Sequence, residues 1–306
     1  TATGFILSGT GTTSGVQIVS ADGLAHETTI ASGGTQDVES GGVASATSIY
    51  FGGTQIINSG GSVVGTEAAG GTQVVKSGAT GTITSGRDAF QKINGGAGSI
   101  GTLDGGGQYI SAGTGSIGAM ISGTQRVSSG ASGSIGIMSA GVQEGDGTGS
   151  IGTMLAGTQR TSAGAGIDTM SGGVQDVYVT GSIGAMISGV QWIYRGGTGS
   201  VTTLNGGTQD IMIGAGQVAT LNGGTQIVED NANGSVTTMN GGSQIVEDNA
   251  NGSVTTLNGG SQIVNNGGVG SVTTMNGGTQ NVNKGGSGVA TSITLGGEQN
   301  ISGGGY

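Results

Sequence analysis

Two acidic segments, Glu229–Gly234 and Glu247–Gly252, carry the residue types best suited to chemistry in this chain. Both read Glu-Asp-Asn-Ala-Asn-Gly, and the second follows the first by 18 residues. If 18 residues form one turn of a repeating β-structure, Asp230 and Asp248 stack about 4.8 Å apart, the spacing of neighbouring strands. Two carboxylates at such a distance resemble the pair of a retaining glycosidase, and carboxylate-rich turns also bind calcium.

The residues around these carboxylates complete neither kind of site. No Arg, Lys, His or Tyr lies in the same repeats to hold a sugar or tune a pKa. The twelfth position of a calcium loop, which requires a bidentate Glu, is Asn240 or Asn258. We therefore expect a duplicated solvated turn, with no catalytic residue and no metal. A carbohydrate-active enzyme centred on Asp230 and Asp248, a polysaccharide lyase or hydrolase, is the alternative, and whether the turns bind a cation stays open.

Other motifs of catalysis are weaker. Segments 113–118 and 147–152 fit the G-x-G-x-x-G phosphate-binding pattern, but neither opens a helix, which that pattern requires. The single histidine, His26, has Asp22 and Glu27 near it in sequence, and a surface turn explains it without a catalytic triad. Cysteine is absent, so thiolate chemistry is excluded. The sequence predicts no enzyme activity and no cofactor.

The composition is strongly biased. The chain has 306 residues, of which 74 are Gly and none is Pro, and only 8% are charged, with a net charge of −10. An ordinary soluble domain has about 7% Gly and about 25% charged residues. Seven scattered Lys and Arg residues form no basic patch, which argues against nucleic acid as a partner. No stretch approaches the roughly 20 apolar residues that span a bilayer.

A glutamine recurs every 16 to 19 residues along the whole chain. A repeat this short, rich in Val, Ile, Thr and glycine turns, fits one coil of a parallel β-solenoid. The predicted fold class is therefore all-β, a right-handed parallel β-solenoid of about 17 coils with 16–19 residues per coil. The series is Gln17, Gln36, Gln55, Gln73, Gln91, Gln108, Gln125, Gln143, Gln159, Gln175, Gln191, Gln209, Gln226, Gln244, Gln262, Gln280 and Gln299.

Apolar residues keep fixed positions relative to this glutamine. Two residues after it, fifteen of seventeen coils carry Val or Ile. Eight before it runs a column from Ile83 to Val272, and five before it runs a column of Leu and Met from Leu103 to Met275. We interpret these columns as a continuous core. Because strand side chains alternate, the glutamine should also face inward, where stacked amides can form a hydrogen-bonded ladder.

The same alternation makes predictions for the outer surface. The residue after each glutamine should face outward, and it varies in type, as Lys92, Trp192 and Asp210 illustrate. Adjacent residues should leave opposite faces, so pairs such as Thr237-Thr238 are not expected to form the flat threonine array of β-helical ice-binding proteins.

The repeat comes in three variants without a domain boundary. Looser coils occupy residues 1–95, coils with Gly-Ser-Ile-Gly occupy 96–200, and coils with Gly-Ser-Val-Thr-Thr occupy 201–306. We expect one β-solenoid over residues 1–306. Because an uncapped solenoid end exposes strand edges and core, we also expect a larger parent protein.

The repeat resembles that of a known family. Residues 32–44 read Ser-Gly-Gly-Thr-Gln-Asp-Val-Glu-Ser-Gly-Gly-Val-Ala, and residues 290–297 read Ala-Thr-Ser-Ile-Thr-Leu-Gly-Gly. They resemble the two halves of the repeat of AIDA-type autotransporter adhesins, the AIDA/TibA group, over essentially the whole chain. The resemblance implies a right-handed β-solenoid passenger on the outer membrane of a Gram-negative bacterium, surface-exposed or secreted. It implies roles in aggregation, biofilm and host-cell attachment, and the absence of the family's translocator barrel fits a passenger fragment.

The resemblance also implies that a bacterial heptosyltransferase adds heptose to serines in the cytoplasm before export. From the twelfth coil onward the equivalent turns carry Asn205, Asn222, Asn240, Asn258 and Asn276, so modification is not expected there. The candidate acceptors are the serines of Ser-Gly corners, Ser32, Ser40, Ser59, Ser77, Ser85, Ser122, Ser129, Ser171 and Ser188.

One outward column carries a row of isoleucines, Ile227, Ile245 and Ile263, beside the acidic turns. A stacked aliphatic row on a surface is a possible contact strip. The partners implied are homotypic passengers on neighbouring cells, the host-cell surface and the heptosyltransferase.

Overall fold

The computed structural model describes residues 1–9, 14–294 and 296–306, so Leu295 of the second repeat phrase lies outside the described residues. The described residues form strands and turns, and they include no helix long and apolar enough to cross a membrane. Their contacts divide into two compact units, unit 1 at Thr1–Gly152 and unit 2 at Thr153–Tyr306. The strand β15 (Thr148–Met154) contains the boundary.

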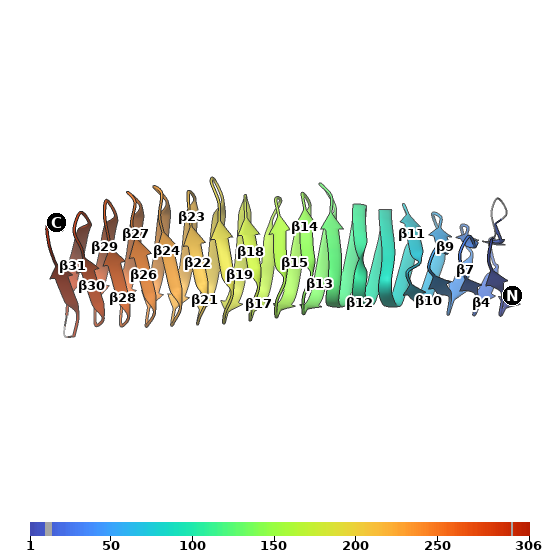
Figure 1. The fold of residues 1–306 in the computed structure, drawn as a ribbon, viewed down its shortest axis with the longest axis horizontal. Coiled ribbons are helices and arrows are strands. Elements are labelled where there is room, and N and C mark those ends of the chain that lie inside the picture. The colour runs from blue at the N-terminus through green and yellow to red at the C-terminus, as the bar shows by residue number, and fades with distance from the viewer. Residues whose placement is uncertain (10–13, 295) are drawn as a thin grey trace. The chain divides into compact units, whose positions relative to one another are not determined.

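In unit 1 each coil stacks on the next, and equivalent strands pair in parallel (Figure 1). The long element β12 runs through three glutamines, Gln91, Gln108 and Gln125, and includes the bends between them. The strands of unit 1 before the boundary are β1 (Ala2–Thr3), β2 (Ile6–Leu7), β3 (Val16–Val19), β4 (Leu24–His26), β5 (Thr29–Ile30), β6 (Thr35–Val38), β7 (Val43–Ser45), β8 (Ser48–Tyr50), β9 (Thr54–Ile57), β10 (Ser62–Ala69), β11 (Thr72–Lys76), β12 (Thr80–Val127), β13 (Ser132–Met138) and β14 (Val142–Gly145).

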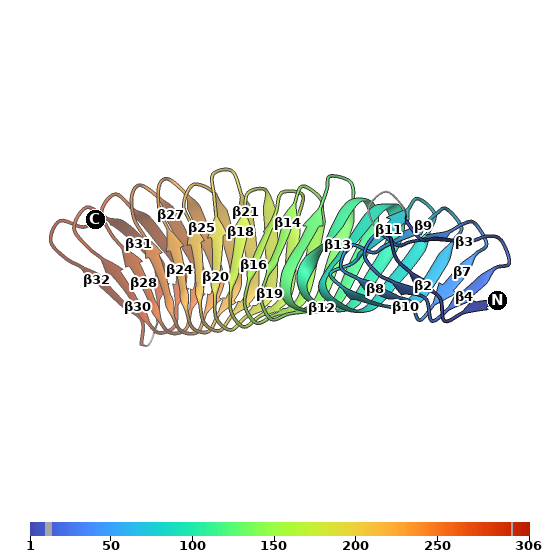
Figure 2. The ribbon, with the colours of Figure 1, turned by 45° about the vertical axis from the view of Figure 1, so that its right-hand side comes forward.

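In unit 2 each coil has a strand of six or seven residues and a four-residue strand that contains the glutamine. The corners between them lie in rows along the stack (Figure 2). The strands are β16 (Thr158–Thr161), β17 (Ala165–Met170), β18 (Val174–Val177), β19 (Thr180–Met186), β20 (Val190–Ile193), β21 (Thr198–Leu204), β22 (Thr208–Ile211), β23 (Ala215–Leu221), β24 (Thr225–Val228), β25 (Asn233–Met239), β26 (Ser243–Val246), β27 (Asn251–Leu257), β28 (Ser261–Val264), β29 (Val269–Met275), β30 (Thr279–Val282), β31 (Ser287–Ile293) and β32 (Glu298–Ile301).

The parallel pairings keep the repeat in register. In unit 2 glutamine pairs with glutamine from coil to coil, as Gln226 with Gln244, and the Val column pairs with itself, as Val228 with Val246. The predicted core columns are buried, including Ile83 to Val272 and Leu103 to Met275. The predicted all-β parallel β-solenoid is therefore confirmed.

A ladder of buried amides runs through each unit, as the alternation predicted. From Gln36 to Gln143 in unit 1, each Nε2 donates to the Oε1 of the preceding glutamine at 2.6–2.8 Å. Unit 2 repeats the contact from Gln175 to Gln299 over the same range of distances. The amide of Gln244 also lies 3.4 Å from the carbonyl oxygen of Gly234 and 3.3 Å from that of Ser253, on the long strands across the interior.

Glycine permits this approach between the two kinds of strand. The second residue of the long strand β27, Gly252, faces the core against β26. A Cβ atom there would collide with the Val246 side chain and lie 3.0 Å from Oε1 of Gln244. The glycine column therefore lets the backbone of the long strand lie directly on the glutamine ladder.

The strict alternation of buried and exposed side chains fails in the middle of the long strands. Val236 and Met239 are both buried, whereas Thr237 is exposed and Thr238 is half-buried. The strand bends between the two core positions, so two successive residues point outward. The expectation that adjacent threonines leave opposite faces was therefore wrong.

Loss of one ladder residue should destabilise unit 2. Gln244→Ala removes the donor to Gln226 Oε1, and it leaves Gln262 Nε2 with only its longer contacts to two backbone carbonyls. We expect a loss of about 2–4 kcal/mol in the free energy of unfolding. Urea unfolding followed by circular dichroism measures it, with Ser243→Ala on the outer face of the same strand as the control. Equal stability of the two variants would contradict a stabilising ladder.

Candidate functional site

The acidic turns follow the four-residue strands β24 and β26. Asp230 and Asp248 adopt positive φ angles of 54° and 53°, a left-handed conformation that Asp and Asn tolerate better than most residues. Both side chains are exposed. The turns stack through their backbones, because the amide of Asn231 donates to the carbonyl of Asp248 at 3.1 Å.

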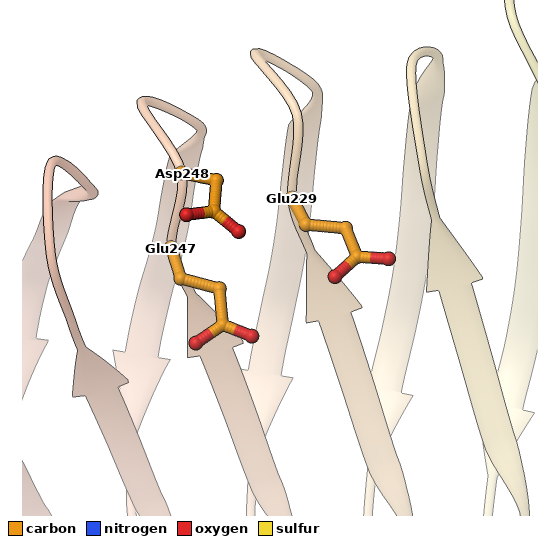
Figure 3. A group of neighbouring side chains, drawn as sticks. All are labelled: Glu229, Glu247 and Asp248. Atoms are coloured by element: carbon orange, nitrogen blue, oxygen red, sulfur yellow. The ribbon is translucent and has the colours of Figure 1, made fainter.

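The carboxylates that come together differ from the predicted pair. Glu229, Glu247 and Asp248 each place one oxygen within 4.8 Å of the others (Figure 3). Asp230 is not part of this acidic cluster, which combines side chains from both turns. The sequence pattern gave the correct segments, but the orientation of the turn residues selects which oxygens meet.

The acidic cluster is electrostatically strained. Burial raises the pKa of Glu229, and the charges of Asp210, Asp230, Glu247 and Asp248 raise it further. Asn265 Nδ2 donates a hydrogen bond to Glu247 Oε2 at 3.1 Å. One oxygen from each of the three carboxylates supplies half or fewer of the six to eight oxygens that calcium prefers. No basic side chain of the described residues pairs with these carboxylates.

A second polar group lies in the outward column after the glutamines. Asp176 is 4% exposed, and its Oδ2 accepts from Arg160 Nε at 2.9 Å while Tyr194 donates to its Oδ1 at 3.3 Å. Asp210 is 7% exposed, with Oδ1 lacking a partner among the described residues, and burial raises its pKa. Trp192 lies between the two in register. Asp210 was predicted to face outward with the rest of its column, and it is nevertheless nearly buried.

His26 contacts two groups that a catalytic triad would use. Its Nδ1 lies 2.9 Å from Ser45 Oγ, and its Nε2 lies 3.4 Å from a Glu27 carboxylate oxygen. The His26 and Glu27 side chains are 44% and 63% exposed. In serine hydrolases the carboxylate is buried and orients the imidazole, so an exposed cluster of this kind receives no catalytic role.

The predicted isoleucine strip forms a continuous row. Ile227 pairs in register with Ile245, and Ile245 with Ile263, on β24, β26 and β28. All three side chains are half-buried instead of fully exposed. Glu229 and Glu247 follow two residues after the first two isoleucines, so the strip borders the acidic cluster.

The predicted serine corners are mostly open to solvent. Ser122 and Ser171 are half-buried, and Ser122 Oγ donates to Asp104 Oδ1 at 2.9 Å. Ser188 donates to the carbonyl of Ser171. The exposed members are Ser32, Ser40, Ser59, Ser77, Ser85, Ser129 and Ser188.

Glycine on the following coil leaves space beside several of these hydroxyls. A Cβ added at Gly52 would lie 2.9 Å from Ser32 Oγ, and one added at Gly78 would lie 2.8 Å from Ser59 Oγ. Both glycines have positive φ angles, of 75° and 71°, which disfavour any side chain there. The stacked corners therefore keep these serine hydroxyls unobstructed.

Each unit also carries a shallow neutral groove along its long strands. The groove of unit 2 has a volume of about 500 Å³ and that of unit 1 about 360 Å³. No charged side chain lines either groove. Hydroxyl and amide side chains dominate, including Thr198, Ser200, Gln217, Asn233, Ser235 and Asn251 in unit 2.

Comparisons with known proteins find similarity among solved structures. No family model matches the chain, and no curated protein matches it. The chain is similar to a solved structure described as the crystal structure of a TibC-catalysed hyper-glycosylated TibA fragment, residues 55–350. The identity is 24%, the match covers 99% of this chain and 97% of that one, and the TM-score is 0.42. At this level of superposition we draw no functional conclusion from the likeness.

Neutralising Glu229 should stabilise unit 2 at neutral pH. A raised pKa means that folding disfavours the charged carboxylate, so Glu229→Gln removes a penalty on the order of 1 kcal/mol or less. The gain should shrink as the pH falls through the raised pKa toward the ordinary glutamate value of about 4.3, below which the carboxyl is protonated in both states. Thermal unfolding as a function of pH measures it, with Glu39→Gln in unit 1 as the matched control. A gain independent of pH would contradict the electrostatic cause.

Proposed function

We propose that the chain is the passenger of a bacterial surface autotransporter and acts as an adhesin that binds copies of itself and host-cell surfaces. The observation that carries the proposal is the repetition of the same small polar side chains, in register, on successive coils. Column after column presents Ser, Thr or Asn at equivalent positions, as Ser235, Ser253 and Ser271 do in the groove of unit 2. Such a surface offers many equivalent weak contacts and no single deep pocket.

Repeated contacts give strength through multivalency. Once one coil engages a partner, the neighbouring coils are held close to equivalent groups on that partner. Linked contacts of this kind raise the overall affinity by about 10²–10⁴-fold over one contact. An adhesin that works in this way needs a regular surface, which the register of the coils supplies.

Exposed corner serines support the second part of the proposal, modification by a bacterial heptosyltransferase before export. Ser32, Ser40 and Ser59 lie at corners where the next coil has a glycine beside the hydroxyl. A sugar attached there would extend into solvent without displacing a side chain. The repeat phrase at residues 32–44, which resembles that of AIDA-type adhesins, points to the same modification.

Surface display should make cells aggregate. We expect bacteria that carry the chain on an outer-membrane anchor to settle faster than cells that carry the anchor with an unrelated protein of similar size. Mixing labelled cells that display the chain with unlabelled cells that lack it separates homotypic contact from general stickiness, because homotypic contact excludes the second population. Settling no faster than the control, at equal display, contradicts self-association.

Glycosylation is tested by the intact mass of the chain expressed in its native strain. We expect a ladder of equal, sugar-sized increments above the mass of the bare polypeptide. Replacing Ser32, Ser40 and Ser59 by Ala should remove increments from the ladder. Ser122→Ala is the matched control, because that hydroxyl is half-buried and donates to Asp104, and it should leave the ladder unchanged. A single peak at the bare mass removes the transferase from the proposal.

A further inference from the structure

Nine Asn-Gly pairs occur in the chain, and five of them occupy one corner column of unit 2. All five asparagines are exposed, and glycine, which lacks a side chain, leaves the following backbone nitrogen unhindered. The five are Asn205, Asn222, Asn240, Asn258 and Asn276.

Asn-Gly pairs are prone to spontaneous deamidation. The glycine backbone nitrogen bonds to Cγ of the asparagine, the bond from Cγ to Nδ2 breaks, and ammonia leaves to give a cyclic imide. Water then opens the ring to aspartate or isoaspartate, so the net reaction consumes one water and releases one ammonia. The nitrogen must approach Cγ to within about 3–3.5 Å, which requires the side chain to turn back onto its own backbone.

The corner column holds its asparagines away from that geometry. Asn240 Nδ2 donates to Asn222 Oδ1 at 2.9 Å, and Asn240 Oδ1 accepts from Asn258 Nδ2 at 3.0 Å. Asn276 continues the row by donating to Asn258 at 3.0 Å, and its Oδ1 accepts from Thr294 Oγ1 at 3.2 Å. Both amide atoms of each inner asparagine are thus engaged along the stack. The glycine nitrogen is also occupied, as in Gly241, whose N–H donates to the carbonyl of Leu221 at 3.3 Å.

Two other Asn-Gly pairs lack the side-chain part of this protection, although the N–H of Gly267, which follows Asn266, donates to the carbonyl of Gly285 at 2.9 Å. Asn94, in unit 1, and Asn266, in unit 2, are exposed. Their side-chain amides have no hydrogen-bond partner among the described residues, so nothing holds Cγ away from the following nitrogen. The chain therefore contains the same reactive dipeptide in an engaged and in a free side-chain state.

We propose that Asn94 and Asn266 are sites of spontaneous deamidation, and that the exposed ladder from Asn222 to Asn276 protects its own Asn-Gly corners from the same reaction. Two engaged amide atoms should slow the reaction on the order of tenfold or more. The asparagine ladder thus makes these exposed corners resistant to deamidation, although each corner contains the reactive Asn-Gly dipeptide.

The first test is ageing of the folded chain in mildly alkaline buffer made with ¹⁸O-labelled water, followed by peptide mapping. The label marks only residues that reacted during ageing. We expect Asn94 and Asn266 to incorporate label at least about tenfold faster than Asn222, Asn240 and Asn258. In urea the difference should vanish, because the dipeptides are the same. Equal rates in the folded chain, or a difference that persists in urea, overturn the proposal.

A variant tests the ladder itself. Asn240→Ala removes the partner of both Asn222 and Asn258, and it should accelerate labelling at these two residues while Asn94 keeps its rate. Asn251→Ala, in a different exposed column, is the matched control and should leave both rates unchanged. Acceleration that extends to Asn94 indicates general unfolding and overturns local protection, as does the absence of acceleration at Asn222 and Asn258.

Discussion

The buried glutamine ladder is the interaction on which the rest of each unit depends. A buried amide without partners destabilises a fold by about 1–3 kcal/mol, and only the first coils add a buried threonine, such as Thr47 or Thr66, that donates to a ladder glutamine. The partner of each glutamine is therefore the glutamine of the adjacent coil, at 2.6–2.8 Å. Coils vary from 16 to 19 residues, yet the ladder keeps its register. Differences in length are consequently absorbed at the corners, where the chain faces solvent.

That division between a fixed interior and variable corners shapes the outer surface. Because Gly252 and its equivalents let the long strands lie on the ladder, every coil has the same narrow cross-section at that point. Outward side chains at equivalent positions then form straight columns, and the neutral grooves follow the strands that the glycines bring inward. A surface for repeated weak contacts is thus a direct consequence of core packing.

The sequence alone predicted the features that the period of the repeat determines. These features are the recurring glutamines, the buried apolar columns that begin at Ile83 and Leu103, and the inward direction of the glutamine side chains. All of them depend on the spacing of residues, which is visible in the sequence. The outward position of Thr237 and Thr238, the burial of Asp210 and the grouping of Glu229 with Asp248 were not predicted. They depend on where alternation breaks inside a long strand, on the packing around one outward position and on side-chain orientation at a left-handed corner. None of these has a periodic signature.

Stacking in register also explains why the chain has so few charges. Each outward residue lies one coil, about 4.8 Å, from the equivalent residue, so identical side chains become neighbours. Carboxylates repel at this distance, and after burial that repulsion contributes to the raised pKa of Glu229. Amides both donate and accept, and therefore satisfy one another. Asn222 and Asn240 stack favourably on the outside for the same reason that Gln226 and Gln244 do on the inside. A repeat that places every side chain beside its equivalents along the stack therefore favours residues that pair with themselves.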